Sequence, residues 1–243
     1  MKTVNLLIVA TARYTEFLPK LLKSVDENFL PDCALIINIF TDKLGVDFDK
    51  MIASLNLECL VYHHYAEHKP WPHATLKRLH FFQNHRYNMP AADYYFYIDA
   101  DTIVQGEIKS EDVLGERVTV QHCGYTNQRG TYETRPESQS YVKPEEGTHY
   151  FGGGFYGFSS EEFWKFVDKA VNMINIDEAN GIIPVWNDES VLNRYMIDSP
   201  PTKILTPSYH YPQSNIEHYK KKWGQDHECK ILLLDKNHKE YQV

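Results

Sequence analysis

The stretch DYYFYIDADTIV, residues 93–104, decides the fold, because an aromatic and β-branched run ends in two aspartates. Such a run predicts a buried strand, since its side chains suit a pleat that is covered on both faces. Residues two apart on a strand point to the same side, so Asp99 and Asp101 can face one point. Two carboxylates at one point repel each other unless a cation or a proton lies between them. A divalent metal, completed by a ligand such as a diphosphate, would relieve that repulsion. The alternative is that Asp99 caps the strand and Asp101 faces solvent.

The composition is that of a globular protein, and the absence of an internal repeat or a low-complexity linker predicts one domain. The chain has 243 residues, 42% of them apolar and 24% charged, so it can bury a substantial core. Its net charge of −8 argues against a nucleic-acid partner. The four cysteines have no paired spacing, which indicates free thiols in a reducing compartment. We expect a cytoplasmic protein without a transmembrane segment, because the apolar run at residues 6–10 is too short to span a bilayer and no signal-peptide cleavage region follows it.

Alternating strands and helices in the first half predict an α/β fold. The expected strands are residues 6–10, 34–40, 57–63 and 93–98, and the expected helices are residues 17–25 and 74–82. This order predicts a parallel sheet with right-handed crossovers. Ligands of such sheets bind outside the carboxyl ends of the strands, so the loops after Ala10, Phe40 and Ile98 are candidate nucleotide sites. No Gly-x-Gly-x-x-Gly dinucleotide fingerprint follows the first strand, and a Walker phosphate loop is absent from the sequence.

The second half offers three further candidate site segments. The polar residues 126–147 predict a binding loop. The glycine run at residues 152–154 either lets the backbone approach a ligand or forms a bulged, tightly packed strand. The sequence WNDES, residues 186–190, puts carboxylates at the start of a helix, where they are either functional or ordinary caps. Another helix is expected to begin at Ser159, and a closing strand at residues 230–234.

Several motifs together resemble the family 6 glycosyltransferases, which include the blood-group A and B transferases and the α-1,3-galactosyltransferases. In family order they are FTD at 40–42, Trp71 with LKR at 76–78, DAD at 99–101, TYE at 131–133, PESQSY at 136–141, the glycine run, WNDES at 186–190, PTKILTP at 201–207 and KNH at 236–238. The resemblance implies a GT-A-type fold, in which a Rossmann-like, mostly parallel nucleotide-binding sheet flanked by helices merges with an acceptor-binding half. It implies one catalytic domain over residues 1–243, with a nucleotide-binding half at about 1–105. The acceptor-binding half, about 106–243, would carry a C-terminal tail that closes on the donor.

The same resemblance implies a reaction and its cofactor. A retaining α-1,3-glycosyltransferase of this kind moves N-acetylgalactosamine (GalNAc) or galactose from UDP to the 3-hydroxyl of a galactose-terminated acceptor, with or without a fucose. Mn²⁺ is the implied metal, with Mg²⁺ as a substitute, and Asp99 and Asp101 would hold it on the diphosphate. Nothing in the sequence indicates an oligomeric state.

Site residues follow from the matched motifs. The implied nucleotide contacts are Val9, Ala10, Thr11, Tyr14, Asp99, Asp101 and Lys236, with Tyr14 stacking on uracil. The implied donor-sugar contacts are Arg78, Gly152, Gly153, Gly154 and Asp188. The implied acceptor contacts are His122, Thr131, Trp186 and Glu189. Glu189 is also the implied catalytic carboxylate, either as a nucleophile or as a stabiliser of positive charge at the anomeric carbon.

Donor choice and departures from the family complete the expectations. Glycine at both 152 and 154 leaves volume for an acetamido group, which predicts UDP-GalNAc. Asn187 stands where the family usually has histidine, and Pro212 where it has aspartate. The tail lacks a second basic residue, whose role Lys239 could take, and the membrane anchor of the animal enzymes is absent. The alternatives to a transferase are a non-catalytic sugar- or nucleotide-binding module and a UDP-sugar hydrolase.

Overall fold

A seven-stranded sheet forms the centre of the computed structural model, which describes residues 1–126, 128–224 and 226–241. The strand order is β3-β2-β1-β4-β7-β6-β8. The strands are β1 (Thr3–Val9), β2 (Ala34–Thr41), β3 (Leu60–Tyr65), β4 (Tyr94–Ile98), β6 (Arg117–Gln121), β7 (Phe151–Ser159) and β8 (Lys203–Leu205). A smaller sheet has the order β5-β10-β9, with β5 (Thr102–Val104), β9 (Tyr211–Pro212) and β10 (Ile231–Leu233).

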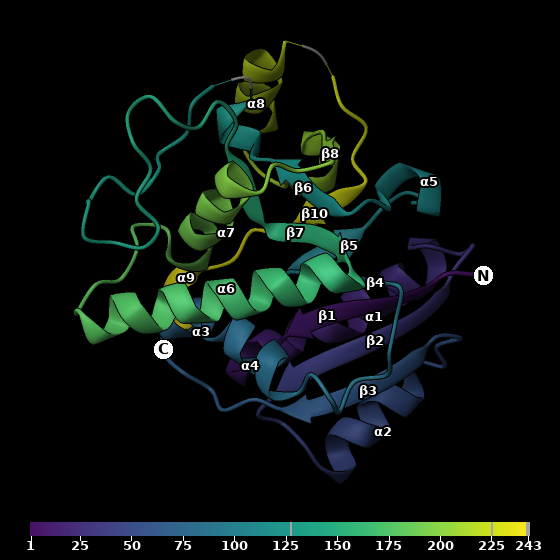
Figure 1. Cartoon of the computed structure of the whole chain (residues 1–243). Coiled ribbons are helices and arrows are strands. Elements are labelled where there is room, and N and C mark those ends of the chain that lie inside the picture. Colours follow the sequence, from purple (N-terminus) through teal and green to yellow (C-terminus); the bar gives the residue numbers. More distant parts are fainter. Residues whose placement is uncertain (127, 225, 242–243) are drawn as a thin grey trace.

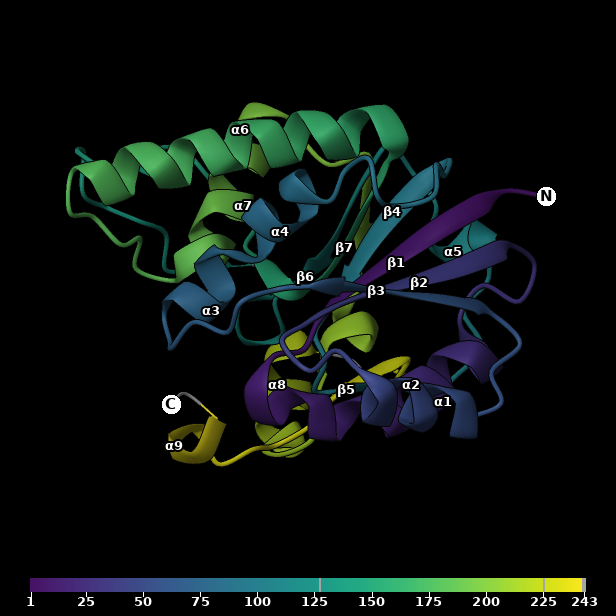
Figure 2. The same cartoon turned by 90° about the horizontal axis from the view of Figure 1, so that it is seen from below.

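Helices cover both faces of the large sheet (Figures 1 and 2). One face carries α1 (Leu18–Asn28) and α2 (Val46–Ser54); the other carries α3 (His73–Leu76), α4 (Arg78–Asn84), α6 (Ser160–Ala179) and α7 (Asn187–Asp198). The remaining helices are η1 (Ala12–Phe17), α5 (Ser110–Val113), η2 (Cys123–Tyr125), η3 (Pro207–His210), α8 (Ile216–Trp223) and α9 (His238–Tyr241). No helix of the described residues is long and apolar enough to cross a membrane.

Each face of the sheet has its own hydrophobic core. Leu6 and Ile8 of β1 belong to the core beneath α1, and Leu7 belongs to the core beneath α6. All three side chains are fully buried, because a strand sends alternate residues to opposite faces and both faces are covered here. This is why the central strands read as continuous apolar runs, and the predicted α/β class is confirmed.

Strand direction changes in the middle of the sheet. β1 pairs in parallel with β2 and β4, and β2 pairs in parallel with β3. β7 then pairs antiparallel with both β4 and β6. The sheet is therefore mostly parallel in its first half and mixed in its second, which is consistent with a GT-A-like fold.

The strand expected at residues 93–98 is confirmed as β4, but the strand geometry expected for Asp99 and Asp101 is wrong. β4 ends at Ile98, and β5 begins at Thr102 in the smaller sheet, where it pairs with β10. Asp99 and Asp101 therefore lie in the turn between two sheets. The break is stabilised by the Thr102 hydroxyl, which donates to the Asp99 carbonyl at 2.6 Å.

Two further boundaries differ from the sequence prediction. The third strand begins at Leu60 instead of residue 57, because the Asp26 carboxylate accepts hydrogen bonds from the backbone N–H groups of Glu58 and Cys59 and holds them in a turn. The helix expected over residues 74–82 is two helices, α3 and α4, which meet at Lys77. The helix that follows Ser159, the helix that follows Trp186 and the closing strand are confirmed.

The glycine run lies in a bulge of β7. Thr119 of β6 pairs with Tyr156 of β7, whereas Val120 pairs with Gly152, so residues 153–155 of β7 have no partner in β6. On its other side the run stays paired, since the Asp99 N–H donates to the Gly154 carbonyl at 2.9 Å. The bulged, tightly packed strand is thus present, and it reaches the turn that carries the aspartates.

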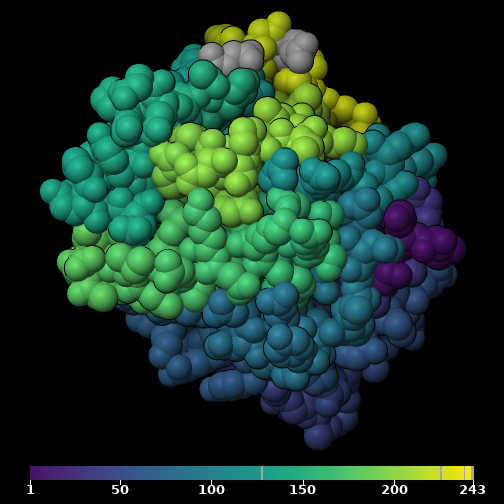
Figure 3. Space-filling view, in the orientation of Figure 1, coloured from purple at the N-terminus to yellow at the C-terminus, as the bar shows by residue number. Residues whose placement is uncertain are grey.

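The long polar segment between η2 and β7 has no regular helix or strand among its described residues, as expected for a loop. It forms a lobe beside the end of α6 (Figure 3).

Gly157 gives a test of the packing between β4 and β7. It lies opposite Phe96, and a Cβ at position 157 would lie 2.1 Å from the Phe96 ring. We expect Gly157→Ala to lower the free energy of unfolding by about 1–3 kcal/mol, because the core must shift to admit the methyl group. Urea denaturation measures this change. The control is Gly106→Ala, where the nearest atoms are the end of the flexible Lys230 side chain at 3.2 Å; an equal loss in both variants would contradict the packing argument.

Candidate active site

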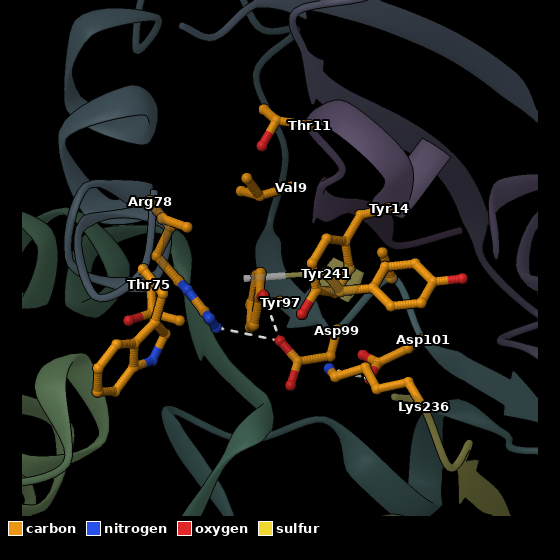
Figure 4. A pocket seen from close by; sticks show the side chains of 13 residues that line it. Val9, Thr11, Tyr14, Thr75, Arg78, Tyr97, Asp99, Asp101, Lys236 and Tyr241 are labelled. Carbon is orange, nitrogen blue, oxygen red and sulfur yellow. Dashed lines mark hydrogen bonds and ion pairs between the residues drawn. The ribbon is translucent and has the colours of Figure 1, made fainter. Parts of the chain in front are cut away.

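A pocket lies at the carboxyl ends of β1 and β4, the edge of the sheet at which α/β folds bind ligands. Its lining residues come from β1, η1, α3, α4, the turn after β4 and the C-terminal tail (Figure 4). They are Val9, Thr11, Tyr14, Trp71, Ala74, Thr75, Arg78, Tyr97, Asp99, Ala100, Asp101, Lys236 and Tyr241. Asp99 and Asp101 thus face one pocket, and the expectation that Asp101 could face solvent is wrong, since that residue is 9% exposed.

Asp99 is held by two donors. Arg78 Nη1 lies 3.1 Å from Asp99 Oδ1, and the Tyr97 hydroxyl donates to the same oxygen. Figure 4 shows both side chains pointing at this carboxylate. Tyr97 is the last residue but one of β4, so it lies next to the turn that carries Asp99. Both contacts are made to Oδ1, and neither Arg78 nor Tyr97 donates a hydrogen bond to Asp99 Oδ2.

Asp101 pairs with Lys236 of the tail. The Lys236 ammonium also lies 4.8 Å from the centre of the Tyr14 ring, a cation–π contact. Burial and the neighbouring Asp99 charge raise the pKa of Asp101, whereas Lys236 opposes that rise. The backbone supports the pair, because the Leu234 N–H donates to the Asp101 carbonyl at 2.9 Å.

Arg78 joins Asp99 to Asp188. Its guanidinium is 8% exposed and packs over the Tyr97 ring at 4.6 Å. Arg78 Nε lies 3.1 Å from Asp188 Oδ2, an ion pair whose alignment does not meet hydrogen-bond geometry. Burial raises the pKa of Asp188 to about 6, although the Arg78 charge opposes the rise. Two side chains implied to hold the donor sugar therefore contact each other.

Asp188 lies beside the pocket, where it pairs with Arg78, so the charged groups in and next to the pocket are more often acidic than basic. Two cations, Arg78 and Lys236, face three carboxylates, those of Asp99, Asp101 and Asp188. Such an excess favours a further cation, and carboxylate oxygens suit a hard divalent ion. No group of three or more His, Cys, Asp or Glu side chains within the described part of the chain could hold a metal by itself. A metal at Asp99 and Asp101 would need further ligands from a bound molecule or water.

Glu189 lies in the first turn of α7, and both of its carboxylate oxygens accept hydrogen bonds. The Gly153 N–H donates to Oε2 at 2.8 Å, and the Tyr150 hydroxyl donates to Oε1 at 2.8 Å. Burial raises the pKa of Glu189 to about 7, and these two hydrogen bonds oppose the rise. The carboxylate is thus fixed in orientation and titrates near neutral pH.

The three implied acceptor residues gather near Glu189. Trp186 is 48% exposed, so it is not a core residue, and its Nε1 donates to the Thr131 hydroxyl at 2.8 Å. The His122 ring packs against the Tyr150 ring, with centroids 5.7 Å apart. Burial lowers the pKa of His122 to about 3, so this imidazole is neutral.

The implied uracil contacts divide into two groups. Val9, Thr11 and Tyr14 line the pocket. Ala10 does not line it; the residue is fully buried, and its N–H donates to the Phe40 carbonyl at 2.9 Å. It acts as a spacer that turns its neighbours toward the pocket.

The glycines leave less room than the sequence suggested. His210 lies against both Gly152 and Gly154, so the volume expected to be open for an acetamido group holds an imidazole in this structure. Gly153 instead faces Glu189. The steric argument for UDP-GalNAc therefore depends on His210 as well as on the two glycines, and the choice of donor stays a prediction.

The departures from the family pattern have structural correlates. Asn187 adopts a φ of 52°, in the left-handed region that asparagine tolerates better than most residues. Pro212 pairs with Leu233 in the smaller sheet and presents no carboxylate. The tail is held by Glu240, which pairs with Arg13, and by Tyr241, whose ring packs edge-on against Tyr14 at 5.4 Å.

Three residues of this region were missed from the sequence. Tyr97 could have been found from its spacing to Asp99, and Tyr150 from its place just before the glycine run. His210 gave no signal, because nothing local distinguishes it from the other 11 of the 12 histidines.

Comparison with known proteins assigns a family. The family model described as "Glycosyltransferase family 6" matches residues 1–242.

Individual relatives agree with that match. The histo-blood group ABO system transferase 1 of Rattus norvegicus is 30% identical over 222 residues, which cover 87% of this chain and 61% of the relative. The globoside alpha-1,3-N-acetylgalactosaminyltransferase 1 of Gallus gallus is 29% identical, over 85% of this chain and 61% of the relative. The O-antigen biosynthesis glycosyltransferase WbnI of Escherichia coli is 25% identical, over 96% and 94%. The chain thus spans about three fifths of the animal relatives and nearly all of the bacterial one.

Glu189→Gln tests the electrostatics of the site. A pKa raised to about 7 means that the folded chain holds this proton more tightly than the unfolded chain, so stability is lost as pH rises from about 5 to 8. Glu189→Gln has no such proton to lose, so its free energy of unfolding does not fall in this way. We expect the difference in the free energy of unfolding, Glu189→Gln minus native, to grow as pH rises through that window, by at most about 1.4 kcal/mol per pH unit.

Urea unfolding at pH 5 and pH 8 measures the effect. Glu161→Gln, at an 80% exposed side chain of α6, is the control for removing a carboxylate from a helix start. A stability difference between Glu189→Gln and the native chain that does not change with pH would refute the assignment.

Proposed function

Because the chain belongs to glycosyltransferase family 6, we propose that it is a retaining α-1,3-glycosyltransferase that moves galactose or GalNAc from UDP to the 3-hydroxyl of a galactose-terminated acceptor. One observation carries the proposal: Asp99, Asp101, Arg78 and Lys236 converge in one pocket, next to Asp188 and Glu189. Residues 1–105 would bind the nucleotide, and residues 106–243 would bind the acceptor and supply the tail lysine.

The uridine would bind between the end of β1 and η1. The Tyr14 ring offers a stacking surface for uracil, and Val9 and Thr11 flank it. In this structure Lys236 and Tyr241 lie against that ring, so both would have to move when a base stacks there. Lys236 would then follow the diphosphate, to which an ammonium is suited.

Asp99 and Asp101 would hold Mn²⁺, or Mg²⁺ as a substitute, with the diphosphate oxygens as further ligands. The excess of carboxylates over cations in the pocket supports this assignment. When bound, the cation would supply Lewis-acid stabilisation of the UDP leaving group. Arg78 would keep Asp99 and Asp188 in place around the donor sugar.

Glu189 would act at the anomeric carbon. Retention requires either a covalent intermediate followed by a second displacement, or attack on an ion pair from the face that UDP leaves. A carboxylate can serve both routes, as a nucleophile or as a stabiliser of positive charge. Tyr150 and Gly153 would orient it by the two hydrogen bonds to its oxygens. Either role requires the ionised form.

The acceptor galactose would lie against Trp186. Its exposed ring can cover the apolar face of a sugar, and Thr131 holds the indole by its Nε1–H. His122, which is neutral, would offer hydrogen bonding at the same site.

An assay of UDP release and product tests the proposed activity. We expect UDP-Gal or UDP-GalNAc, with Mn²⁺ and a galactose-terminated acceptor, to give UDP and a glycosylated product, and EDTA to abolish both. Free sugar without product would support a hydrolase, and the absence of UDP release would support a binding module. Product formed at full rate in EDTA would refute the metal assignment.

Asp101→Asn tests the metal ligand. We expect a fall in kcat/KM of at least about 100-fold, because one of the two protein ligands loses its charge. Circular dichroism should be unchanged. Asp47→Asn, at an exposed position of α2, should retain full activity. Equal activity of the two variants would remove Asp101 from the site.

A further inference from the structure

The imidazole of His210 occupies the space beside the glycine run. A Cβ placed on Gly152 would lie 2.9 Å from His210 Cε1, and one placed on Gly154 would lie 3.2 Å from His210 Nε2. Both distances are shorter than ordinary van der Waals contact, so the ring packs directly over the two Cα atoms. No side chain, however small, fits at either glycine without a shift of the ring.

The same glycines connect His210 to both carboxylates of the proposed reaction. The Cβ position of Gly154 lies 2.9 Å from Asp99 Oδ2, and the N–H of Gly153 donates to Glu189 at 2.8 Å. A sugar bound between Asp99 and Glu189 would thus pass over the glycine run, and the edge of the imidazole would border it.

His210 is buried, and its Nδ1 has no hydrogen-bond partner among the described residues. The side chain is 8% exposed, and its ring centroid lies 5.4 Å from that of His122. An apolar side chain of similar volume would therefore break no hydrogen bond at Nδ1.

We propose that His210 is a specificity-determining residue for the donor sugar, because its ring limits the size of the substituent that fits beside the glycine run. This inference rests on the proposed function. The two candidate donors differ at C2, where galactose has a hydroxyl and GalNAc has an acetamido group. The glycines would admit the larger group only to the extent that the imidazole leaves space for it.

The experiment compares the two donors in three forms of the full chain. For each form, kcat/KM for UDP-GalNAc and for UDP-Gal is measured with Mn²⁺ and one acceptor. We expect His210→Ala to raise the ratio of UDP-GalNAc to UDP-Gal by about tenfold or more, since a few atoms of pocket volume change discrimination by that order. We expect His210→Leu, which nearly conserves the volume, to stay within about threefold of the native ratio.

The control is His64→Ala. His64 is also a buried imidazole, 7% exposed, but it lies in β3 and contacts Asn38, away from the pocket. It should lower the melting temperature without changing the donor ratio. Near-UV circular dichroism checks that each variant is folded.

Binding separates this inference from the proposed function. Calorimetry measures the dissociation constants of UDP-Gal and UDP-GalNAc in the presence of Mn²⁺. Both donors contain UDP, so the ratio of the two constants reports the difference in binding between the two sugars. If the native chain transfers neither sugar, the proposed function fails, and the binding ratio in His210→Ala still decides the role of His210. An unchanged ratio in His210→Ala would overturn the inference. So would a shift in His210→Leu as large as that in His210→Ala, because the nitrogens rather than the volume would then distinguish the sugars.

Discussion

Three neighbouring carboxylates that share two cations are the constraint on which the site depends. Asp101 and Asp188 are buried, and desolvation penalises a buried charge unless a cation lies beside it. The chain supplies Arg78 from α4 and Lys236 from the C-terminal tail. Two cations for three carboxylates is the imbalance that supports our proposal of a metal ion at this site.

The smaller sheet explains how a lysine so late in the chain meets Asp101. β5 follows directly after the aspartates, and β10 pairs with β5 just before Lys236. Leu234 then bonds to the Asp101 backbone, so the tail is fixed at the site by main-chain contacts before its side chain takes part. The bulge of β7 has a similar effect on the other side, because it turns the Gly153 N–H toward Glu189. Backbone geometry thus places both ends of the candidate site.

The sequence predicted those parts of the site that depend on one strand or one helix. The apolar runs of β1, β2 and β4 predicted the sheet and its ligand-binding edge, and WNDES predicted carboxylates at a helix start. The separate strand β5 after the aspartates could not be predicted, because β5 is recruited by β10 from more than 100 residues away. His210 escaped for the same reason: its contact with Gly152 and Gly154 is a product of tertiary packing, which leaves no periodic signal in the chain.

Binding of Mn²⁺ in the presence of UDP would show whether Asp99 and Asp101 hold a metal, because it requires neither an acceptor nor turnover. Electron paramagnetic resonance reports the free ion, whose signal falls as the ion binds. We expect the native chain with UDP to remove this signal at stoichiometric Mn²⁺. The Asp99→Asn/Asp101→Asn double variant, whose fold is checked by circular dichroism, should leave a signal as large as that of Mn²⁺ with UDP and no protein. Equal loss of the signal in both proteins would show that the two aspartates are not where the metal binds.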